Sequence, residues 1–224
     1  MKSIKTEAIV LRRTNYGEAD RIIQILTPNH GKLSVIAKGV RKEKSKLAQG
    51  VELFSVSEFV LYIGKSEIHT LTSVRLKKFY RHILEDYSRL ECAYEILKKI
   101  NKISEHIEES NLYNYLLTAI KSLDDKTIDE RIIKAWIALH FAEVKGHGLN
   151  LSRDSENKPL LADKTYRFDI AEMSFVEDIR GSFGAEHLKL LKILKLKDPD
   201  FISQISGIEP YLNDCLSLAN AAAE

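Results

Sequence analysis

The sequence has few of the features that mark secreted, disulfide-bonded or membrane-spanning proteins. Its 224 residues include two cysteines, Cys92 and Cys215, which are far apart and lack metal-ligand spacing. Such cysteines are typical of structural thiols in a reduced compartment, with a redox role as the alternative. No apolar run approaches the roughly 18 residues that a membrane span needs, and the start, MKSIKTEAIV, lacks the apolar core of a signal peptide. We therefore expect a cytoplasmic protein without a membrane partner.

Patterns typical of enzymes and metal sites are also lacking. There is no glycine-rich loop of the Walker or dinucleotide-binding type, no G-x-S-x-G and no convincing cysteine–histidine arrangement. His140 and His147 are seven residues apart, so they could share a helix face, but no carboxylate or cysteine completes a ligand set. We expect no catalytic residue, no metal site and no cofactor.

Positive and negative charges are separated along the chain. The whole sequence has 34 Lys and Arg against 32 Asp and Glu. Residues 1–82 hold 16 Lys and Arg and 7 Asp and Glu, a net charge of +9. The remainder holds 18 Lys and Arg and 25 Asp and Glu, a net charge of −7. A basic part of this size is expected where one domain binds a polyanion.

The positive charge is densest in residues 38–46, which we call the basic loop. Its nine positions hold five cations and a single acid, Glu43. A solvated excursion between two strands is the alternative interpretation of such a run. The five cations are Lys38, Arg41, Lys42, Lys44 and Lys46.

Five β-strands are predicted in the first 80 residues, on both sides of the basic loop. They are rich in Ile, Val and Leu and are separated by turn residues such as Gly17. In the last one, strict alternation predicts Leu71 and Val74 on opposite faces. Since there is no room for helical crossovers, a small closed barrel is the expected way to hide the strand edges. The predicted strands are 5–13, 20–27, 32–38, 54–63 and 67–78.

From residue 82 onward, apolar residues recur at three- and four-residue steps, which predicts amphipathic helices. Thr127 and Glu130 form a candidate capping box for the third helix, and 146–148 (GHG) is a candidate stop. A polar, loop-like stretch at 149–169 contains Pro159, which excludes regular helix there. The predicted helices are 90–103, 112–123, 132–142, 185–197 and 209–222.

The strand-rich stretch resembles the N-terminal OB-fold of the RecO family of bacterial recombination mediators. The family pattern is E-x-D-x-I, T-x-x-x-G-K-L, A-K-G-x-R-x-x-x-S, a Phe-containing strand and L-Y. FAEVKGHGLNL (141–151) resembles the family's L-x-x-x-G-Y-x-x-x-L helix end more loosely. The matching residues of the pattern are Glu18, Asp20, Ile22, Thr27, Gly31, Lys32, Leu33, Ala37, Lys38, Gly39, Arg41, Ser45, Phe54, Leu61 and Tyr62.

The resemblance implies an α+β protein, with a five-stranded OB-fold β-barrel at 1–80 followed by an all-α helical domain at 81–224. It implies a cytoplasmic, nucleoid-associated DNA-repair protein without enzymatic turnover. Such proteins bind single- and double-stranded DNA, anneal complementary strands and associate with RecR. They also bind the acidic C-terminal tail of single-stranded-DNA-binding protein and help to load RecA.

Two departures from the family pattern matter. Many members carry a four-cysteine zinc site after the helix end, but LNLSRDSENKPLLADKTYRF (149–168) has no cysteine, so we expect a zinc-free protein. The family also tends to end in a basic helix, whereas ISGIEPYLNDCLSLANAAAE (205–224) is neutral to acidic. The resemblance therefore does not extend to contacts made through that terminal helix.

The candidate DNA-binding surface is the basic loop, together with cations of the strands that could extend it. Aromatic residues are absent from 32–50, as expected of a site that grips phosphates and leaves bases free to pair. In the helical part, an apolar groove rimmed by cations would suit an acidic tail, which nominates Arg131, Lys134 and Trp136. The strand cations are Arg12, Arg13, Arg21, Lys32, Arg75 and Lys77.

Two other functions remain open at this point. The barrel could bind RNA in a translation or RNA-turnover factor, which a preference for single-stranded RNA over DNA would indicate. It could instead be a protein-interaction module whose basic loop meets an acidic partner tail, in which case no DNA would be retained at low salt.

Overall fold

The computed structural model describes residues 2–105 and 111–224, and they form two compact units, Met1–Asp124 and Asp125–Glu224. The unit that contains the barrel continues to Asp124. The predicted domain boundary after residue 80 stays a prediction. None of the described helices is long and apolar enough to cross a membrane.

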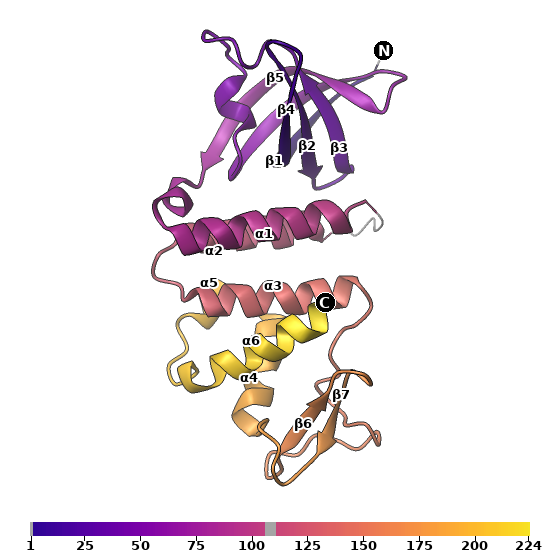
Figure 1. Ribbon diagram of the computed structural model, residues 1–224, viewed down its shortest axis with the longest axis vertical. Helices are drawn as coiled ribbons and strands as arrows, with labels where there is room; N and C mark the ends of the chain where they lie inside the picture. The colour runs from indigo at the N-terminus through magenta and orange to yellow at the C-terminus, as the bar shows by residue number, and fades with distance from the viewer. Residues whose placement is uncertain (1, 106–110) are drawn as a thin grey trace. The chain divides into compact units, whose positions relative to one another are not determined.

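The first unit begins with the predicted five-stranded barrel (Figure 1). The strands form a closed sheet in the order β1-β2-β3-β5-β4, and β1 pairs with β4 to close it. All pairs are antiparallel except β3 with β5. This connectivity is that of the OB-fold, so the predicted fold class is confirmed. The bounds are β1 Lys2–Tyr16, β2 Asp20–Thr27, β3 Gly31–Ala37, β4 Ser55–Ile63 and β5 Ile68–Phe79.

The barrel interior is filled by alternate residues of the strands, as the apolar pattern predicts. The predicted alternation is wrong in β5, because the register with β4 shifts between Val60 and Leu61. Leu61 is paired with Leu71 and Val60 with Ser73, so that Leu71 and Val74 both pack on the core. A bulge of this kind re-aims the side chains that follow it. The fully buried core residues include Ala8, Val10, Ile23, Ile25, Val35, Ala37, Phe59 and Leu61.

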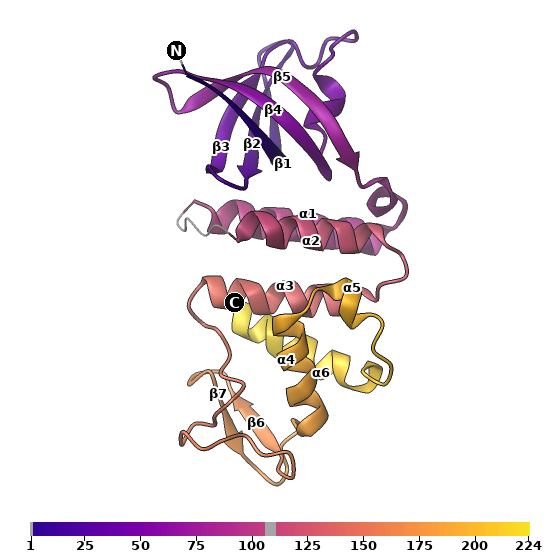
Figure 2. The same cartoon turned by 180° about the vertical axis from the view of Figure 1, so that it is seen from behind.

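Two predicted helices, α1 (Tyr87–Ile103) and α2 (Leu112–Asp124), follow the barrel after a short 3₁₀ turn, η2 (Arg81–Glu85). They lie side by side at one end of the barrel, as Figures 1 and 2 show. The hydroxyl of Tyr113 donates a hydrogen bond of 2.7 Å to Oε1 of Glu7 and so ties α2 to β1. The opposite end of the barrel carries the β1–β2 turn and the basic loop (Figure 2).

The second unit holds the remaining three predicted helices, together with structure that was not predicted. The unpredicted elements are the four-residue helix α5 and a two-stranded hairpin, so the description of this part as all-α is incomplete. The absence of helix around Pro159 is confirmed. The bounds are α3 Glu130–Val144, β6 Tyr166–Asp169, β7 Ser174–Glu177, α4 Ala185–Leu196, α5 Pro199–Ile202 and α6 Glu209–Ala223.

The ends of α3 show one wrong and one correct prediction. Asp129, not Thr127, caps the start: its Oδ1 accepts a hydrogen bond of 2.8 Å from the backbone N of Arg131. Thr127 instead donates to Oδ1 of Asp125. The predicted stop is confirmed, because Gly146 and His147 donate backbone hydrogen bonds of 2.9 and 2.8 Å to the carbonyls of Glu143 and Ala142.

Candidate nucleic-acid interface

The basic loop follows a defined path at the open end of the barrel. Gly39 has a φ of +64°, a conformation that favours glycine, and its N–H donates a hydrogen bond of 2.7 Å to Oδ1 of Asp20. The backbone N of Arg41 donates to the carbonyl of Ala19 at 2.9 Å. The loop is therefore fastened to the start of β2.

Apolar residues within and after the loop add a second attachment. Val40 is buried in the barrel core, and Leu47 is partly buried against it. The 3₁₀ turn η1 (Ala48–Val51) follows at once, and Val51 is fully buried. Sequence reasoning missed these anchors, although Val40 and Leu47 are visible as isolated apolar residues in a cationic run. These buried residues hold the backbone of the loop in place, while its cationic side chains extend into solvent.

All five cations of the basic loop are exposed. Among the residues that the structure describes, none of the five forms an ion pair with an acidic side chain, and Glu43 within the loop is exposed as well. Nη1 of Arg41 lies 3.4 Å from the carbonyl oxygen of Gly17. The positive charge of the loop is therefore available to an anion from solution.

Arg12 and Arg13 are adjacent on β1 but point to different sides of the sheet. Arg13 is paired in register with Ile23, a core residue, and its guanidinium forms an ion pair with Glu52. Arg21 lies 3.8 Å from the same carboxylate. Arg12 is paired with Gln24 on the outer face and is exposed, with no ion pair among the described residues. Arg12 is thus exposed and without an ion pair among the described residues, as the cations of the basic loop are. Arg13 and Arg21 lie at the barrel rim around Glu52.

The other predicted strand cations lie apart from the loop, and Lys32 and Lys77 form ion pairs with acidic side chains. Nζ of Lys32, only 11% exposed, donates hydrogen bonds of 2.9 Å to the carbonyl of Asn101 and 2.8 Å to Oε1 of Glu105, both beyond the far end of the barrel. Its prediction as a DNA contact has no support in this geometry.

Arg75 and Lys77 lie on the outer face formed by β1, β4 and β5. Arg75 on β5 is paired in register with Glu58 on the neighbouring strand β4, and Lys77 forms an ion pair of 2.6 Å with Glu7. The hydrogen bond from Lys77, with a second from Tyr113, lowers the pKa of Glu7. This face therefore alternates in charge, unlike the basic loop, and is a weaker candidate for an anion.

Comparison with known proteins finds similarity over the same residues that form the barrel. Residues 1–80 match the family model described as "Recombination protein O N terminal". The chain is 29% identical over 221 residues to the DNA repair protein RecO of Alkaliphilus metalliredigens. This match covers 96% of this chain and 89% of that protein. The chain is thus similar to RecO proteins, and the match to the family model is confined to the barrel.

Other RecO proteins match the chain less completely. The RecO of Thermoanaerobacter sp. is 32% identical over 148 residues, and that of Acetivibrio thermocellus is 39% identical over 124 residues. These matches cover 66% and 55% of this chain, but only 59% and 49% of the two relatives. They therefore cover only part of these RecO proteins.

The three residues nominated for an acidic tail do not form a cationic rim. Trp136 is 2% exposed, and its ring packs on that of His140. The Arg131 guanidinium forms an ion pair of 2.6 Å with Asp129, and Lys134 one of 2.9 Å with Glu130. The nomination stays a prediction, but the geometry does not favour it.

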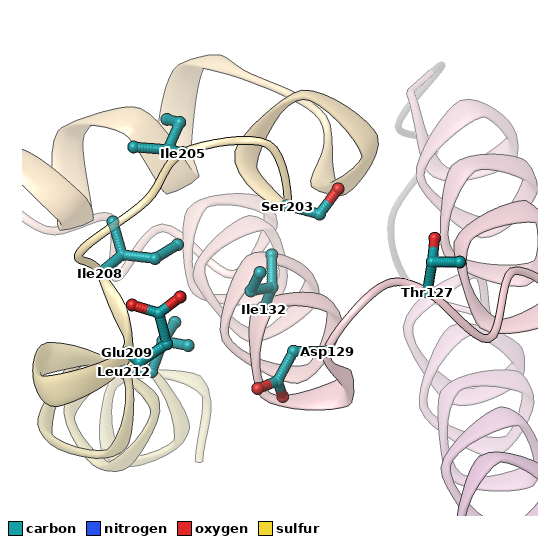
Figure 3. Close-up of a pocket in the computed structure, with 8 residues that line it drawn as sticks. All are labelled: Thr127, Asp129, Ile132, Ser203, Ile205, Ile208, Glu209 and Leu212. Carbon is teal, nitrogen blue, oxygen red and sulfur yellow. The ribbon is translucent and has the colours of Figure 1, made fainter.

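A small pocket lies next to Arg131 in the second unit (Figure 3). It has a volume of about 150 Å³, and its lining includes Ile132 and Leu212 together with the carboxylates of Asp129 and Glu209. Figure 3 shows both carboxylate groups at the same side of the pocket. Two acidic side chains make it a poor site for an acidic peptide.

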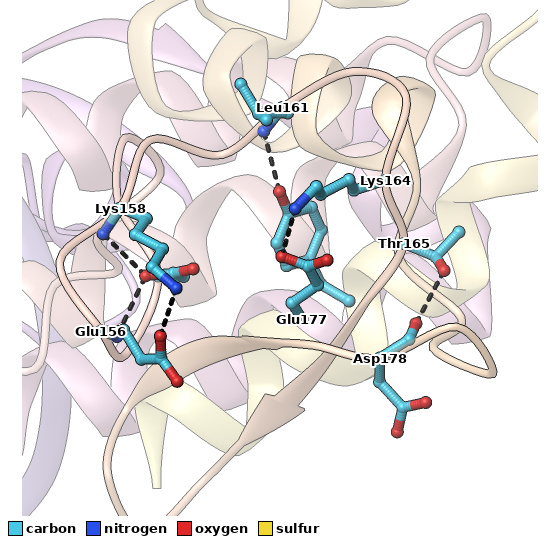
Figure 4. Close-up of polar contacts among 9 residues, drawn as sticks. Glu156, Lys158, Leu161, Lys164, Thr165, Glu177 and Asp178 are labelled. Atoms are coloured by element: carbon cyan, nitrogen blue, oxygen red, sulfur yellow. Dashed lines mark hydrogen bonds and ion pairs between the residues drawn. The ribbon is translucent and has the colours of Figure 1, made fainter.

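The polar segment that begins at residue 149, in which we expect no zinc site, is held together by hydrogen bonds (Figure 4). Oδ1 of Asp154 accepts from the backbone N of Glu156 and of Lys158, at 3.0 and 2.8 Å. Thr165 Oγ1 donates to the carbonyl of Asp178 at 2.7 Å, as Figure 4 shows. Within 2–105 and 111–224, no three His, Cys, Asp or Glu residues gather as a metal site would require. That the protein is free of zinc stays a prediction.

Proposed function

We propose that this protein is a DNA repair and recombination mediator that binds single- and double-stranded DNA through the basic loop, anneals complementary strands and has no catalytic turnover. Its relatives are named as DNA repair proteins, and its first 80 residues match a recombination-protein domain. The observation that carries the proposal is the set of five exposed cations at one end of an OB-fold barrel. Among the described residues none of the five forms an ion pair with an acidic side chain, and the loop that carries them is anchored to the barrel. OB-folds bind nucleic acid through one sheet face and the adjoining loops.

The arrangement suits annealing rather than sequence readout. Lysine and arginine contacts to phosphates fix the position of a strand but carry no base information. Neutralised phosphates repel a complementary strand less, and the base edges stay free to pair. Binding of this kind depends strongly on salt, because each contact releases counterions.

The partners proposed for this chain are those that the family resemblance implies. They are RecR, the C-terminal tail of single-stranded-DNA-binding protein and, indirectly, RecA, which the protein would help to load onto coated single strands. The proposed role implies a cytoplasmic protein associated with the nucleoid. We assign the tail to the second unit without naming its residues, since Arg131 and Lys134 are paired with acids there.

Strand annealing is the direct test. Complementary oligonucleotides are mixed with the protein, with and without single-stranded-DNA-binding protein, and duplex formation is followed over time. We expect faster annealing in both cases, and slower annealing by an Arg41→Ala, Lys42→Ala, Lys44→Ala variant. No acceleration by the wild-type protein would contradict the proposal. Retention of RNA but not DNA would indicate an RNA-binding factor, and retention of neither at low salt would indicate a protein-interaction module.

A further inference from the structure

The fold brings an aromatic residue to the basic loop that the sequence places elsewhere. No aromatic residue occurs between 32 and 50. Tyr16, however, is the last residue of β1, and the turn that follows it touches the loop. Its side chain is 55% exposed, and within residues 2–105 and 111–224 no other aromatic ring packs on it.

The direction of Tyr16 follows from the strand register. A shift between Val10 and Arg12 leaves Val10 facing the core and makes Arg12 the first outward residue of the exposed part of β1. Because side chains alternate along a strand, Thr14 and Tyr16 point outward with Arg12. These residues span roughly 13 Å of strand, at about 3.3 Å per residue. An arginine and a tyrosine thus stand in one row on the outer face of the barrel.

The basic loop adjoins this row at its tyrosine end. Gly17, directly after Tyr16, has a φ of +55°, and its carbonyl accepts the contact from Nη1 of Arg41. The backbone N of Arg41 is held 2.9 Å from the carbonyl of Ala19. Asp20, the cross-strand neighbour of Tyr16, has Oδ1 occupied by the N–H of Gly39. Tyr16 therefore lies between Arg12, four residues earlier on the same strand, and Arg41, which contacts the residue that follows it.

We propose that Tyr16 is a stacking platform for one unpaired nucleobase, with the phosphates on either side of that base held by Arg41 and by Arg12. This rests on the proposed function and adds a base-binding subsite to the phosphate-binding loop. A stacked base must be unpaired, so the subsite favours single strands over duplex. One platform holds one base and leaves its neighbours free, which is compatible with annealing. Because every base has an aromatic face, no sequence preference is expected.

The test compares Tyr16→Ala and Tyr16→Phe with the wild-type protein on three probes: a single strand, the same strand with abasic sites, and a duplex. Stacking of one base is worth about 1–3 kcal/mol by alanine substitution, so Tyr16→Ala should weaken single-strand binding about 5- to 150-fold. Tyr16→Phe should bind as the wild type does. Tyr87, 80% exposed on the first turn of α1, provides the control variant Tyr87→Ala, which should change nothing.

The abasic strand separates stacking from other effects. On that strand and on duplex, wild type and Tyr16→Ala should bind alike, and the dependence of binding on salt should be the same for both proteins. Unchanged single-strand affinity of Tyr16→Ala, or an equal loss on the abasic strand, would overturn the stacking platform and leave the proposed function in place. A wild-type protein that binds none of the three probes would overturn both.

Discussion

At the scale of residues, the two neighbouring arginines of β1 show how much one position changes a role. Arg12 is exposed on the outer face, whereas Arg13 is turned to the barrel rim, where it pairs with Glu52. Composition alone treats them as one basic pair. Alternation along the strand places them on opposite faces, and the register shift after Val10 decides which of the two points outward. Alternation can be predicted from sequence, but a bulge that resets it cannot be located without the partner strand.

Single substitutions should separate these roles. Arg12→Ala should weaken single-strand binding and reduce the slope of log affinity against log salt by about 0.7, the value for one lost phosphate contact. Arg13→Ala should keep that slope and lower the free energy of unfolding by up to about 1 kcal/mol, because a partly exposed ion pair is lost. Salt titrations and urea unfolding measure both. An equal loss of slope in the two variants would show that Arg13 also contacts DNA.

His140 is a second residue whose role depends on its environment. It is buried on α3 against Trp136, with 4.4 Å between ring centroids. Burial lowers its pKa from 6.5 to about 4; Lys195 acts in the same direction, whereas Glu143 and Asp198 act against it. The sequence offered His140 as a weak metal candidate, and the structure makes it a histidine held neutral in the interior.

This predicts acid sensitivity in the second unit. The folded state takes up the His140 proton less readily than the unfolded state, so stability is full above about pH 6.5 and is lost as the pH falls toward 4. The loss should approach 1.4 kcal/mol per pH unit within that window. Urea unfolding followed by the fluorescence of Trp136, the single tryptophan, measures it. His140→Gln should flatten the profile between pH 6.5 and 5, whereas His147→Gln, at an exposed position, should not. A wild-type profile that is flat in this range would refute the account.

At the scale of elements, the sequence predicted best where apolar residues recur regularly. The stretch DRIIQILT was predicted as a strand at the bounds that β2 has, because its branched apolar residues suit a pleated surface. The β6–β7 hairpin was missed, because its strands are only four residues long and β6 lies in the polar stretch 149–169. The alternation of Tyr166 and Phe168 was the available signal, and both rings contact Phe175 on the partner strand.

The same segment carries a prediction about metal. Its turns are closed by Asp154, Thr165 and the hydroxyl of Tyr166, which accepts a hydrogen bond of 2.8 Å from the backbone N of Leu161. Since residues 149–168 contain no cysteine, we expect no stoichiometric zinc in the purified protein and the same melting temperature with and without a chelator. Elemental analysis and thermal unfolding check this. About one zinc per chain, or a large loss of stability in chelator, would show that histidines and acids dismissed as ligands bind metal.

At the scale of the whole molecule, the separation of charge is the feature that sequence alone revealed most directly. Residues 1–82 carry a net +9 and the remainder a net −7. The structure resolves the positive part into a free loop, a rim pair around Glu52 and a mixed-charge face. That division could not be predicted, because it depends on which cations meet a carboxylate across strands that are distant in sequence.

The central claim is that the basic loop neutralises phosphates, and a salt titration of single-strand binding tests it most directly. With about three to five contacts, log affinity should fall against log salt with a slope of roughly −2 to −3.5. The Arg41→Ala, Lys42→Ala, Lys44→Ala variant should flatten the slope by about two units. The control variant Lys98→Ala, Lys99→Ala, Lys102→Ala removes the same charge from exposed positions of α1 and should keep the wild-type slope. Equal slopes for all three proteins, with unchanged melting temperatures, would contradict the account.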